Sequence, residues 1–206
     1  MIINLYTTFC WHSSQERNLE YLYCLQQNIQ NKHLNNVFVL SEKEMDLSWN
    51  SKLSLIRTEH RPTFADLFSM ANDIHMSGIN IVCNSDIFFT EFYIQRIVSN
   101  IKLGEMYALS RWDIFSDGRV RHHDNQHSQD SWIYLNRYID CSNLEFMPGK
   151  AGCDNRLAFE LRLQNFRLLN PSKRIRSFHY HLSQIRDYKR CPSDTVAPPY
   201  LFIPSS

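Results

Sequence analysis

The chain has 206 residues, 43% of them hydrophobic, so it can bury a full-sized core as one domain, alone or as a module of a longer protein. Its formal net charge of +1 argues against a global electrostatic attraction to nucleic acid or to an acidic membrane. The longest apolar runs are too short for a membrane segment, which takes about 20 residues. Without a secretion signal or a Cys-x-x-Cys pair, the sequence leads us to expect a cytoplasmic protein with reduced thiols.

Strand-like and helix-like segments alternate through the first half of the chain. Apolar and β-branched runs predict strands at residues 2–8, 37–40, 53–57, 79–83 and 106–110. Helices are predicted at residues 17–29 behind Ser13 or Ser14, from Thr63 to about Met76, and from Thr90 to about Ile101. This order predicts an α/β fold, with a mostly parallel central sheet flanked by helices. In such folds, ligands bind beyond the carboxyl ends of the strands.

The second half of the chain is less regular. Residues 113–131 are rich in polar side chains and contain the turn signal Asp117-Gly118, which predicts a hairpin or a long loop over the site. A helix is predicted at residues 154–165 and a short strand at 168–170, before an end rich in proline and serine from Pro192 onward. No repeat is evident, so residues 1–206 are predicted to form a single domain.

Two polar segments stand where a site is expected. Asn84-Ser85-Asp86 ends the strand at residues 79–83, where a carboxylate can hold a divalent cation that bridges two phosphates. These are also ordinary turn residues. Asp154 follows a glycine-bearing loop at a predicted helix start, where it is either a general base or a helix N-cap.

Two further clusters carry polar side chains suited to ligands. His179 and His181 point the same way on a strand, so both can reach one metal or phosphate, although an exposed strand could also carry them. Asp130 and Trp132 suit a sugar, whose ring would stack on the indole while its hydroxyls bind the acid. A polar loop anchored by a buried Trp132 is an equally good interpretation.

Glycine-rich phosphate loops are missing from the sequence. Thr7-Thr8-Phe9-Cys10 follows the first strand, which disfavours nicotinamide dehydrogenases and P-loop enzymes. A phosphate ligand would then be held by a metal and by arginines such as Arg57, Arg61 and Arg111.

Taken together, these segments resemble GT-A nucleotide-sugar glycosyltransferases, from Ile2 to about Tyr188. Within that group the chain looks like the small bacterial and large-DNA-virus branch, including the amino-terminal domain of multi-domain chlorella-virus glycosyltransferases. The resemblance is carried by the joint order of Asn84-Ser85-Asp86-Ile87-Phe88-Phe89, Ala108-Leu109-Ser110-Arg111-Trp112-Asp113, Ser128-Gln129-Asp130-Ser131-Trp132, Gly149-Lys150-Ala151-Gly152-Cys153-Asp154-Asn155-Arg156 and Asn170-Pro171-Ser172.

The resemblance implies a GT-A (Rossmann-like) fold and a metal site at the end of the strand 79–83. Asn84-Ser85-Asp86 matches the family's Asp-x-Asp motif, with Asp86 as the retained second acid and Asn84 in place of the first. His179 or His181 resembles the late histidine that completes the metal shell in some members. The implied cofactor is Mn²⁺ or Mg²⁺.

The same resemblance implies roles for residues on either side of that metal. Thr7 and Thr8 match the region that receives the nucleoside, and Arg57 sits where the base or ribose is commonly met. Asp154 matches the catalytic carboxylate of inverting members. Apart from the resemblance, Asp130 stands beside Trp132 in an irregular polar segment, so we expect it to orient the acceptor sugar. A helix start normally lowers the pKa of a carboxyl group, so we expect a lowered pKa for Asp154.

The sequence therefore predicts a metal-dependent, inverting glycosyltransferase. It would move a sugar from an NDP-sugar, with a UDP-sugar as the expected donor, to a hydroxyl of an oligosaccharide or glycoprotein glycan. Nucleic-acid partners and membrane segments are not expected. Two alternatives stay open. A nucleotidyltransferase would typically show a glycine-rich, basic loop after its first strand, which is missing here. A carbohydrate-binding or assembly module with a decayed site is encouraged by Asn84.

Overall fold

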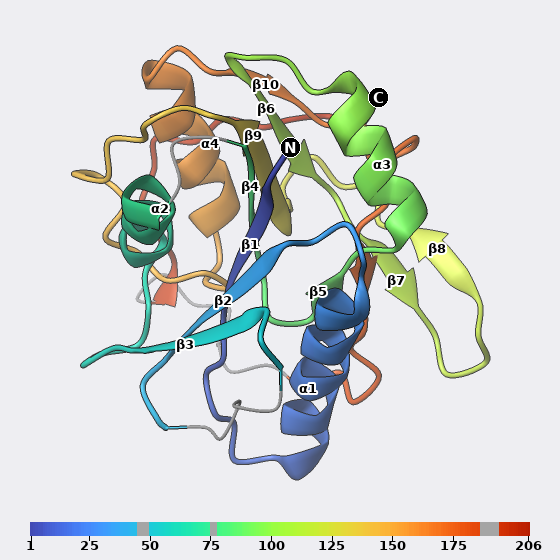
Figure 1. Ribbon diagram of the computed structural model, residues 1–206. Helices are drawn as coiled ribbons and strands as arrows, with labels where there is room; N and C mark the ends of the chain where they lie inside the picture. Colours follow the sequence, from blue (N-terminus) through green and yellow to red (C-terminus); the bar gives the residue numbers. More distant parts are fainter. Residues whose placement is uncertain (45–49, 75–77, 186–193) are drawn as a thin grey trace.

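A seven-stranded sheet forms the centre of the protein in the computed structural model, which describes residues 1–44, 50–74, 78–185 and 194–206 (Figure 1). Its strands, in spatial order, are β10 (Arg167–Leu169), β6 (Glu105–Leu109), β9 (Ser131–Leu135), β4 (Ile79–Cys83), β1 (Ile3–Thr8), β2 (Asn36–Ser41) and β3 (Leu53–Arg57). Within this sheet β9 runs antiparallel to both of its neighbours, while the remaining pairings are parallel. The predicted mostly parallel α/β architecture is confirmed.

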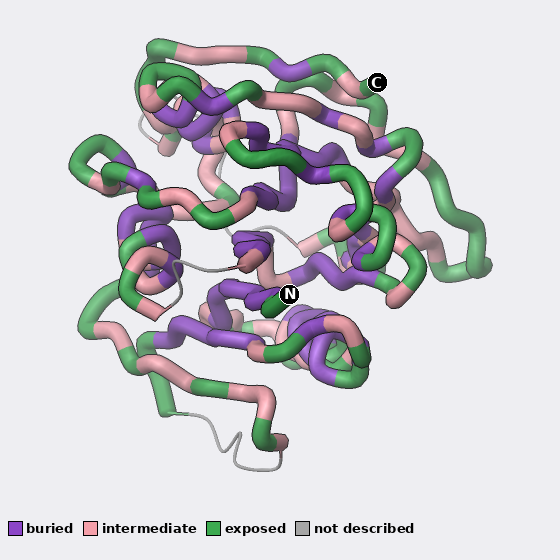
Figure 2. The backbone as a smooth tube through the Cα atoms, turned by 45° about the horizontal axis from the view of Figure 1, so that its top comes forward, coloured by how far each residue is buried: buried purple, intermediate pink, exposed green. Residues whose placement is uncertain are grey.

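Two pairs of helices cover the two faces of this sheet (Figure 1). Helices α1 (Gln15–Gln30) and α3 (Glu91–Asn100) pack on the face that carries Leu5, and α2 (Phe64–Ile74) and α4 (Cys153–Leu163) pack on the face that carries Tyr6. Successive side chains of a strand point to opposite faces, so the wholly buried β1 serves both cores. Figure 2 shows the buried strands at the centre and the exposed segments around them.

The helix starts follow from short-range capping. Ser14 is the N-cap of α1, and its side chain accepts a hydrogen bond from the backbone N–H of Arg17. Thr63 and Asp66 form a reciprocal capping box, in which each side chain accepts from the other residue's backbone N–H. Both caps agree with the sequence. The predicted end of the second helix at Met76 lies outside the described residues.

A second, four-stranded sheet lies beside the central one and completes the site. Its order is β5 (Ile87–Phe88), β11 (Phe178–His179), β7 (Trp112–Ile114) and β8 (Val120–His122). The predicted hairpin over residues 113–131 corresponds in part to β7 and β8, which pair antiparallel. Because β11 pairs with β5, the late segment around His179 is held next to the turn that follows β4. In the described part of the chain, no helix is long and apolar enough to cross a membrane.

Candidate functional site

A cleft of about 370 Å³ opens at the carboxyl ends of the central strands. Eight of the side chains predicted from the sequence line it: Arg61, Asn84, Asp86, Arg111, Asp130, Asp154, His179 and His181. They come from the segment between β3 and α2, the turn after β4, the residue before β7, the segment before β9, the start of α4 and the region of β11. Strand ends that meet at one edge of a sheet bring together residues far apart in sequence.

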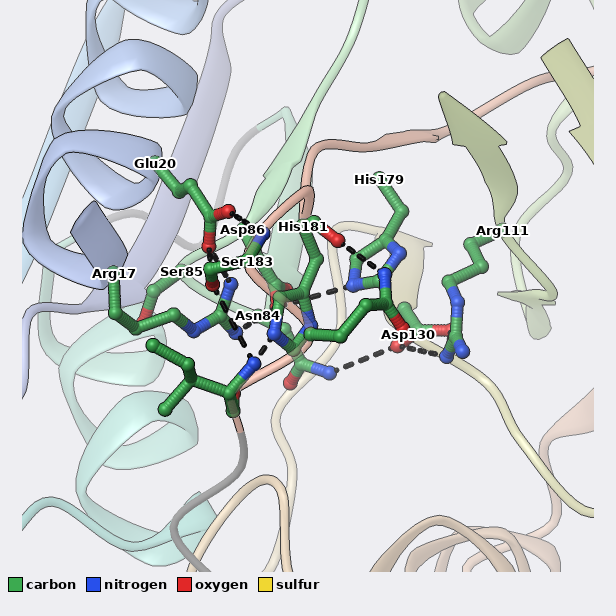
Figure 3. Close-up of polar contacts among 12 residues, drawn as sticks. Arg17, Glu20, Asn84, Ser85, Asp86, Arg111, Asp130, His179, His181 and Ser183 are labelled. Carbon is green, nitrogen blue, oxygen red and sulfur yellow. Dashed lines mark hydrogen bonds and ion pairs between the residues drawn. The ribbon is translucent and has the colours of Figure 1, made fainter. Parts of the chain in front are cut away.

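Asp86 is the centre of a buried polar network in this cleft (Figure 3). Its Oδ2 atom accepts a hydrogen bond from Arg17 Nη2 at 2.5 Å and lies 3.2 Å from His179 Nε2. Burial alone would raise the pKa of Asp86, but His179 and Arg17 outweigh it and hold that pKa well below its usual range. Asp86 is therefore ionised at neutral pH, the form that a carboxylate needs to bind a cation.

His179 and His181 converge on Asp86, with their rings 5.4 Å apart (Figure 3). Tyr180 between them is directed elsewhere and stacks on Tyr23 at a centroid distance of 4.3 Å. The expectation that the two histidines share a face is confirmed. The exposed-strand interpretation is wrong, because both are buried. Ligand atoms of Asp86, His179 and His181 all lie within 4.8 Å of one another, close enough to share one ion.

The chemistry of these donors fits a divalent transition metal. One carboxylate and two imidazoles suit Mn²⁺ better than Mg²⁺, since Mg²⁺ prefers oxygen ligands. His181 Nε2 lies 2.8 Å from the carbonyl oxygen of Ile185, an arrangement that places a proton on Nε2 and leaves Nδ1 free to bind a metal. Burial and the nearby Arg17 lower the pKa of His181 to about 4, so the ring is neutral. Although burial opposes it, contacts with Asp86 and Asp113 raise the pKa of His179 to about 9.

Arg111 joins the candidate metal site to the opposite side of the cleft. Its Nε atom donates to Asp113 Oδ1 at 2.8 Å, and that carboxylate oxygen also lies 2.7 Å from His179 Nδ1. Its Nη1 atom donates to both carboxylate oxygens of Asp130, at 3.2 and 3.3 Å. Asp130 also accepts from Asn84 Nδ2 at 3.1 Å. Arg111 was predicted as a phosphate ligand, and the structure adds that it already holds two carboxylates.

Asp154 lines the same cleft but does not cap its helix. Gly152 is the N-cap of α4, with φ of 79°, so Asp154 is the second residue of the helix. Its Oδ2 atom accepts from the backbone N–H of Gln129 at 3.4 Å. Burial, followed by the nearby charge of Asp130, raises the pKa of Asp154 above its usual range. The N-cap interpretation is wrong, because Gly152 takes that position. The expected lowering of the Asp154 pKa is also wrong, because burial and Asp130 raise it.

Thr7, Thr8, Arg57, Ser85 and Trp132, which were also predicted from the sequence, do not line this cleft. Thr7 and Thr8 are buried at the end of β1, where Thr8 Oγ1 lies 3.0 Å from Ser85 Oγ. Arg57 is exposed at the end of the edge strand β3 and pairs with Glu44 at 3.4 Å. Trp132 is fully buried in β9, so the buried-anchor interpretation holds and stacking of its ring on a sugar is wrong.

The sequence did not predict a site role for Arg17 or Asp113, nor a strand at β9. Arg17 lies four residues before Tyr21 on the buried face of α1, a position usually taken by an apolar side chain. A basic residue in an apolar stripe was the signal that could have found it. Asp113 gave no comparable signal, because it stands in a polar segment where any carboxylate looks solvent-exposed.

Comparisons with known proteins bear on the fold. A mannosyltransferase from Pyrobaculum calidifontis, in complex with GDP-Man and Mn²⁺, is 10% identical, with a TM-score of 0.53 over 88% of this chain and 57% of that one. S. aureus TarS is 11% identical, with a TM-score of 0.53 over 87% and 60%. The bifunctional IspDF from Campylobacter jejuni is 11% identical, with a TM-score of 0.54 over 82% and 49%. This chain thus spans about half to three-fifths of these proteins.

At such low identity these structures show the fold alone. The chain has the Rossmann-like α/β fold of GT-A glycosyltransferases and nucleotidyltransferases. The three structures give no support to the viral branch that the sequence resembles. No protein-family model matches the sequence, and no curated protein matches it.

Proposed function

We propose that this protein transfers a sugar from a nucleoside-diphosphate sugar to a glycan hydroxyl, with inversion and with a divalent cation. One observation carries the proposal: Asp86, His179 and His181 converge within 4.8 Å in the same cleft that holds Asp154. A nucleotide-sugar transferase needs a cationic place for the diphosphate and a base for the acceptor, and this cleft offers candidates for both. The mannosyltransferase of similar fold was solved with a nucleotide sugar and Mn²⁺.

The donor half of the site is assigned to the end of β4 and the region of β11. A cation held by Asp86, His179 and His181 would neutralise the charge that develops on the departing nucleoside diphosphate. Arg61 lines the same cleft and adds a positive side chain that can bind phosphate oxygens. Thr7 and Thr8, at the end of β1, are assigned to the nucleoside, and Ser85 supports that edge through Thr8. A UDP-sugar is the proposed donor. Arg57, which pairs with Glu44 outside the cleft, is assigned to the base or ribose of that donor.

The acceptor half is assigned to Asp154 and Asp130. Asp154 is the proposed general base, which would take the proton of the attacking hydroxyl. Its raised pKa makes the ionised form a stronger base than an exposed aspartate. Asp130 is held by Arg111 and Asn84, so its carboxylate is fixed in direction and suited to orient the hydroxyls of an oligosaccharide or glycoprotein glycan.

The decisive experiment is a thermal-shift panel of UDP- and GDP-sugars with and without Mn²⁺, followed by measurement of released nucleoside diphosphate. We expect stabilisation by at least one donor only with the metal, and slow donor hydrolysis without an acceptor. Asp86→Ala should abolish the metal-dependent stabilisation, whereas Asp117→Ala on the exposed β7–β8 turn should not.

Two other results would replace this proposal with its alternatives. Metal-dependent donor binding without release of nucleoside diphosphate would indicate a carbohydrate-binding or assembly module. Release of pyrophosphate from a nucleoside triphosphate, in the absence of hydrolysis of any NDP-sugar, would indicate a nucleotidyltransferase.

A further inference from the structure

Arg17 already pairs with the carboxylate through which Asp86 would hold a cation. Its Nη2 atom donates to Asp86 Oδ2 at 2.5 Å, and the same oxygen faces His179 Nε2 at 3.2 Å (Figure 3). The Arg17 side chain is only 8% exposed and lines the cleft. In the metal-free protein the guanidinium of Arg17 thus provides the positive charge that neutralises Asp86.

A buried guanidinium and a divalent cation compete for one carboxylate oxygen. Removing charged groups from water is costly, so each must keep an opposite charge within contact distance. Two positive charges at Asp86 Oδ2 would also repel each other strongly in this buried environment. A metal that binds Asp86 Oδ2 would therefore displace Arg17 Nη2, which must then turn toward another anion.

Glu20 allows such a movement without unfolding the helix. It accepts from Arg17 Nη1 at 2.8 Å, one turn away on α1, so the guanidinium keeps one charged partner when Nη2 leaves Asp86. Glu20 is also held independently, by the backbone N–H of Ser183 at 2.6 Å and its hydroxyl at 3.1 Å. The guanidinium of Arg17 also lies over the Tyr21 ring, with Cζ 4.4 Å from the ring centroid.

We propose that Arg17 is an exchangeable positioning residue, which holds Asp86 in the metal-free protein and turns to the donor's diphosphate when a divalent cation takes its place. The second half of this inference rests on the proposed function. Arginine suits the role because its guanidinium has two terminal nitrogens. Nη1 can keep its hydrogen bond to Glu20 while Nη2 donates to a phosphate oxygen. The exchange would also keep the carboxylate paired before the metal arrives.

The test is a titration of Mn²⁺ against nucleotide-free protein, with free Mn²⁺ measured by electron paramagnetic resonance. Arg17→Met keeps the length of the aliphatic stem and removes the competing charge. It should tighten Mn²⁺ binding by about tenfold or more. At saturating Mn²⁺ the same variant should bind UDP or GDP more weakly, by about tenfold, the scale of a lost charge-assisted hydrogen bond. Opposite changes in the two affinities are not expected from a merely structural arginine.

Arg156→Met is the matched control. Arg156 pairs with the buried Glu160 one turn further along α4, as Arg17 does with Glu20, but it does not line the cleft. It should leave both affinities unchanged. Melting curves of each variant confirm folding, and if Arg17→Met does not fold, Arg17→Lys serves instead. The single ammonium of lysine cannot serve Glu20 and Asp86 together as a guanidinium does, so Mn²⁺ should again bind more tightly than in the wild type.

Mn²⁺ binding that is unchanged or weaker in the folded Arg17 variant overturns the inference. Tighter Mn²⁺ binding with unchanged nucleotide affinity overturns its second half. If neither UDP nor GDP binds the wild-type protein, the proposed function fails, whereas the Mn²⁺ titration still decides whether Arg17 competes for Asp86.

Discussion

The Nδ1 atom of His179 lies 2.7 Å from Asp113 Oδ1, on the side of the ring opposite to Asp86. A carboxylate that accepts a hydrogen bond from one ring nitrogen of a histidine keeps a proton on that nitrogen and directs the other nitrogen toward a metal. In His179 these two atoms would be Nδ1 and Nε2. Asp113 is itself oriented by Arg111 Nε at 2.8 Å. The short strand pairing of β11 with β7 places Asp113 opposite His179.

We expect Asp113→Asn to weaken Mn²⁺ binding by about 10- to 100-fold, the usual effect of losing a carboxylate that orients a metal-binding histidine. Calorimetric titration with Mn²⁺ measures this without reference to activity. Asp117→Asn, on the exposed turn of the same hairpin, is the control. Equal Mn²⁺ affinity in the Asp113 variant and the wild type would show that His179 does not depend on this carboxylate for metal binding.

The contact between Asn84 and Asp130 explains why an asparagine stands where an Asp-x-Asp motif has its first aspartate. Its amide donates to Asp130 Oδ1 at 3.1 Å, so an aspartate there would set two carboxylates against each other. We expect Asn84→Asp to lower Tm by about 3 °C or more at pH 7.5. The repulsion raises the folded-state pKa of the pair, so this loss should shrink as the pH falls toward 5 and the pair takes up a proton.

Asn84→Ala separates the two effects, since it removes the hydrogen bond without adding a charge. Its loss in Tm should depend little on pH. Should Asn84→Asp melt like the wild type and bind Mn²⁺ more tightly, the asparagine would be a simple loss of a metal ligand.

Asp154 should make the protein less stable as the pH rises. Its folded-state pKa is raised above the ordinary value of 3.8, so above pH 3.8 the folded state holds more protons than the unfolded state. Stability contributed by the protonated group is complete at low pH and is lost as pH rises through the folded pKa. Asp154→Asn removes this dependence. Its Tm should exceed that of the wild type by about 3 °C or more at pH 8, and by less at pH 5. A lower Tm at both pH values would contradict the burial argument.

The same substitution separates catalysis from binding. Asp154→Asn should lower sugar transfer by about a hundredfold or more, the scale of a lost general base, while donor affinity changes little. Single-turnover transfer and equilibrium donor binding provide the two measurements. Intact transfer by a correctly folded variant would exclude Asp154 as the base.

Asp130→Asn should act chiefly on the acceptor. Because the carboxylate is fixed by Arg111 and Asn84, its replacement should raise the acceptor KM with a smaller change in kcat, the mark of lost ground-state binding. Steady-state kinetics with varied acceptor measure this split. If turnover collapses in Asp130→Asn and survives in Asp154→Asn, the two carboxylates exchange roles.

The elements that depend on neighbours in sequence could be predicted from the sequence alone. Ser14 and Thr63 cap helices through contacts three residues away, and buried strands such as β4 show themselves as continuous apolar runs. These local signals led to an α/β fold whose strand ends carry the site, and eight of the predicted side chains do line one cleft. Strand β9 was missed because the polar residues before it conceal a short apolar run that becomes the antiparallel strand between β4 and β6.

Only the tertiary structure decided which charges meet and which are buried. Arg17 and Asp86 are 69 residues apart, and His179 and Asp113 are 66 apart, so no spacing rule relates them. Whether Trp132 faces a ligand or the core depends on the pairing of β9 on both edges. The pKa of Asp154 is likewise set by burial beside Asp130 rather than by its place in a helix, because the free energy of an ionised group depends on all the charges and solvent around it in space.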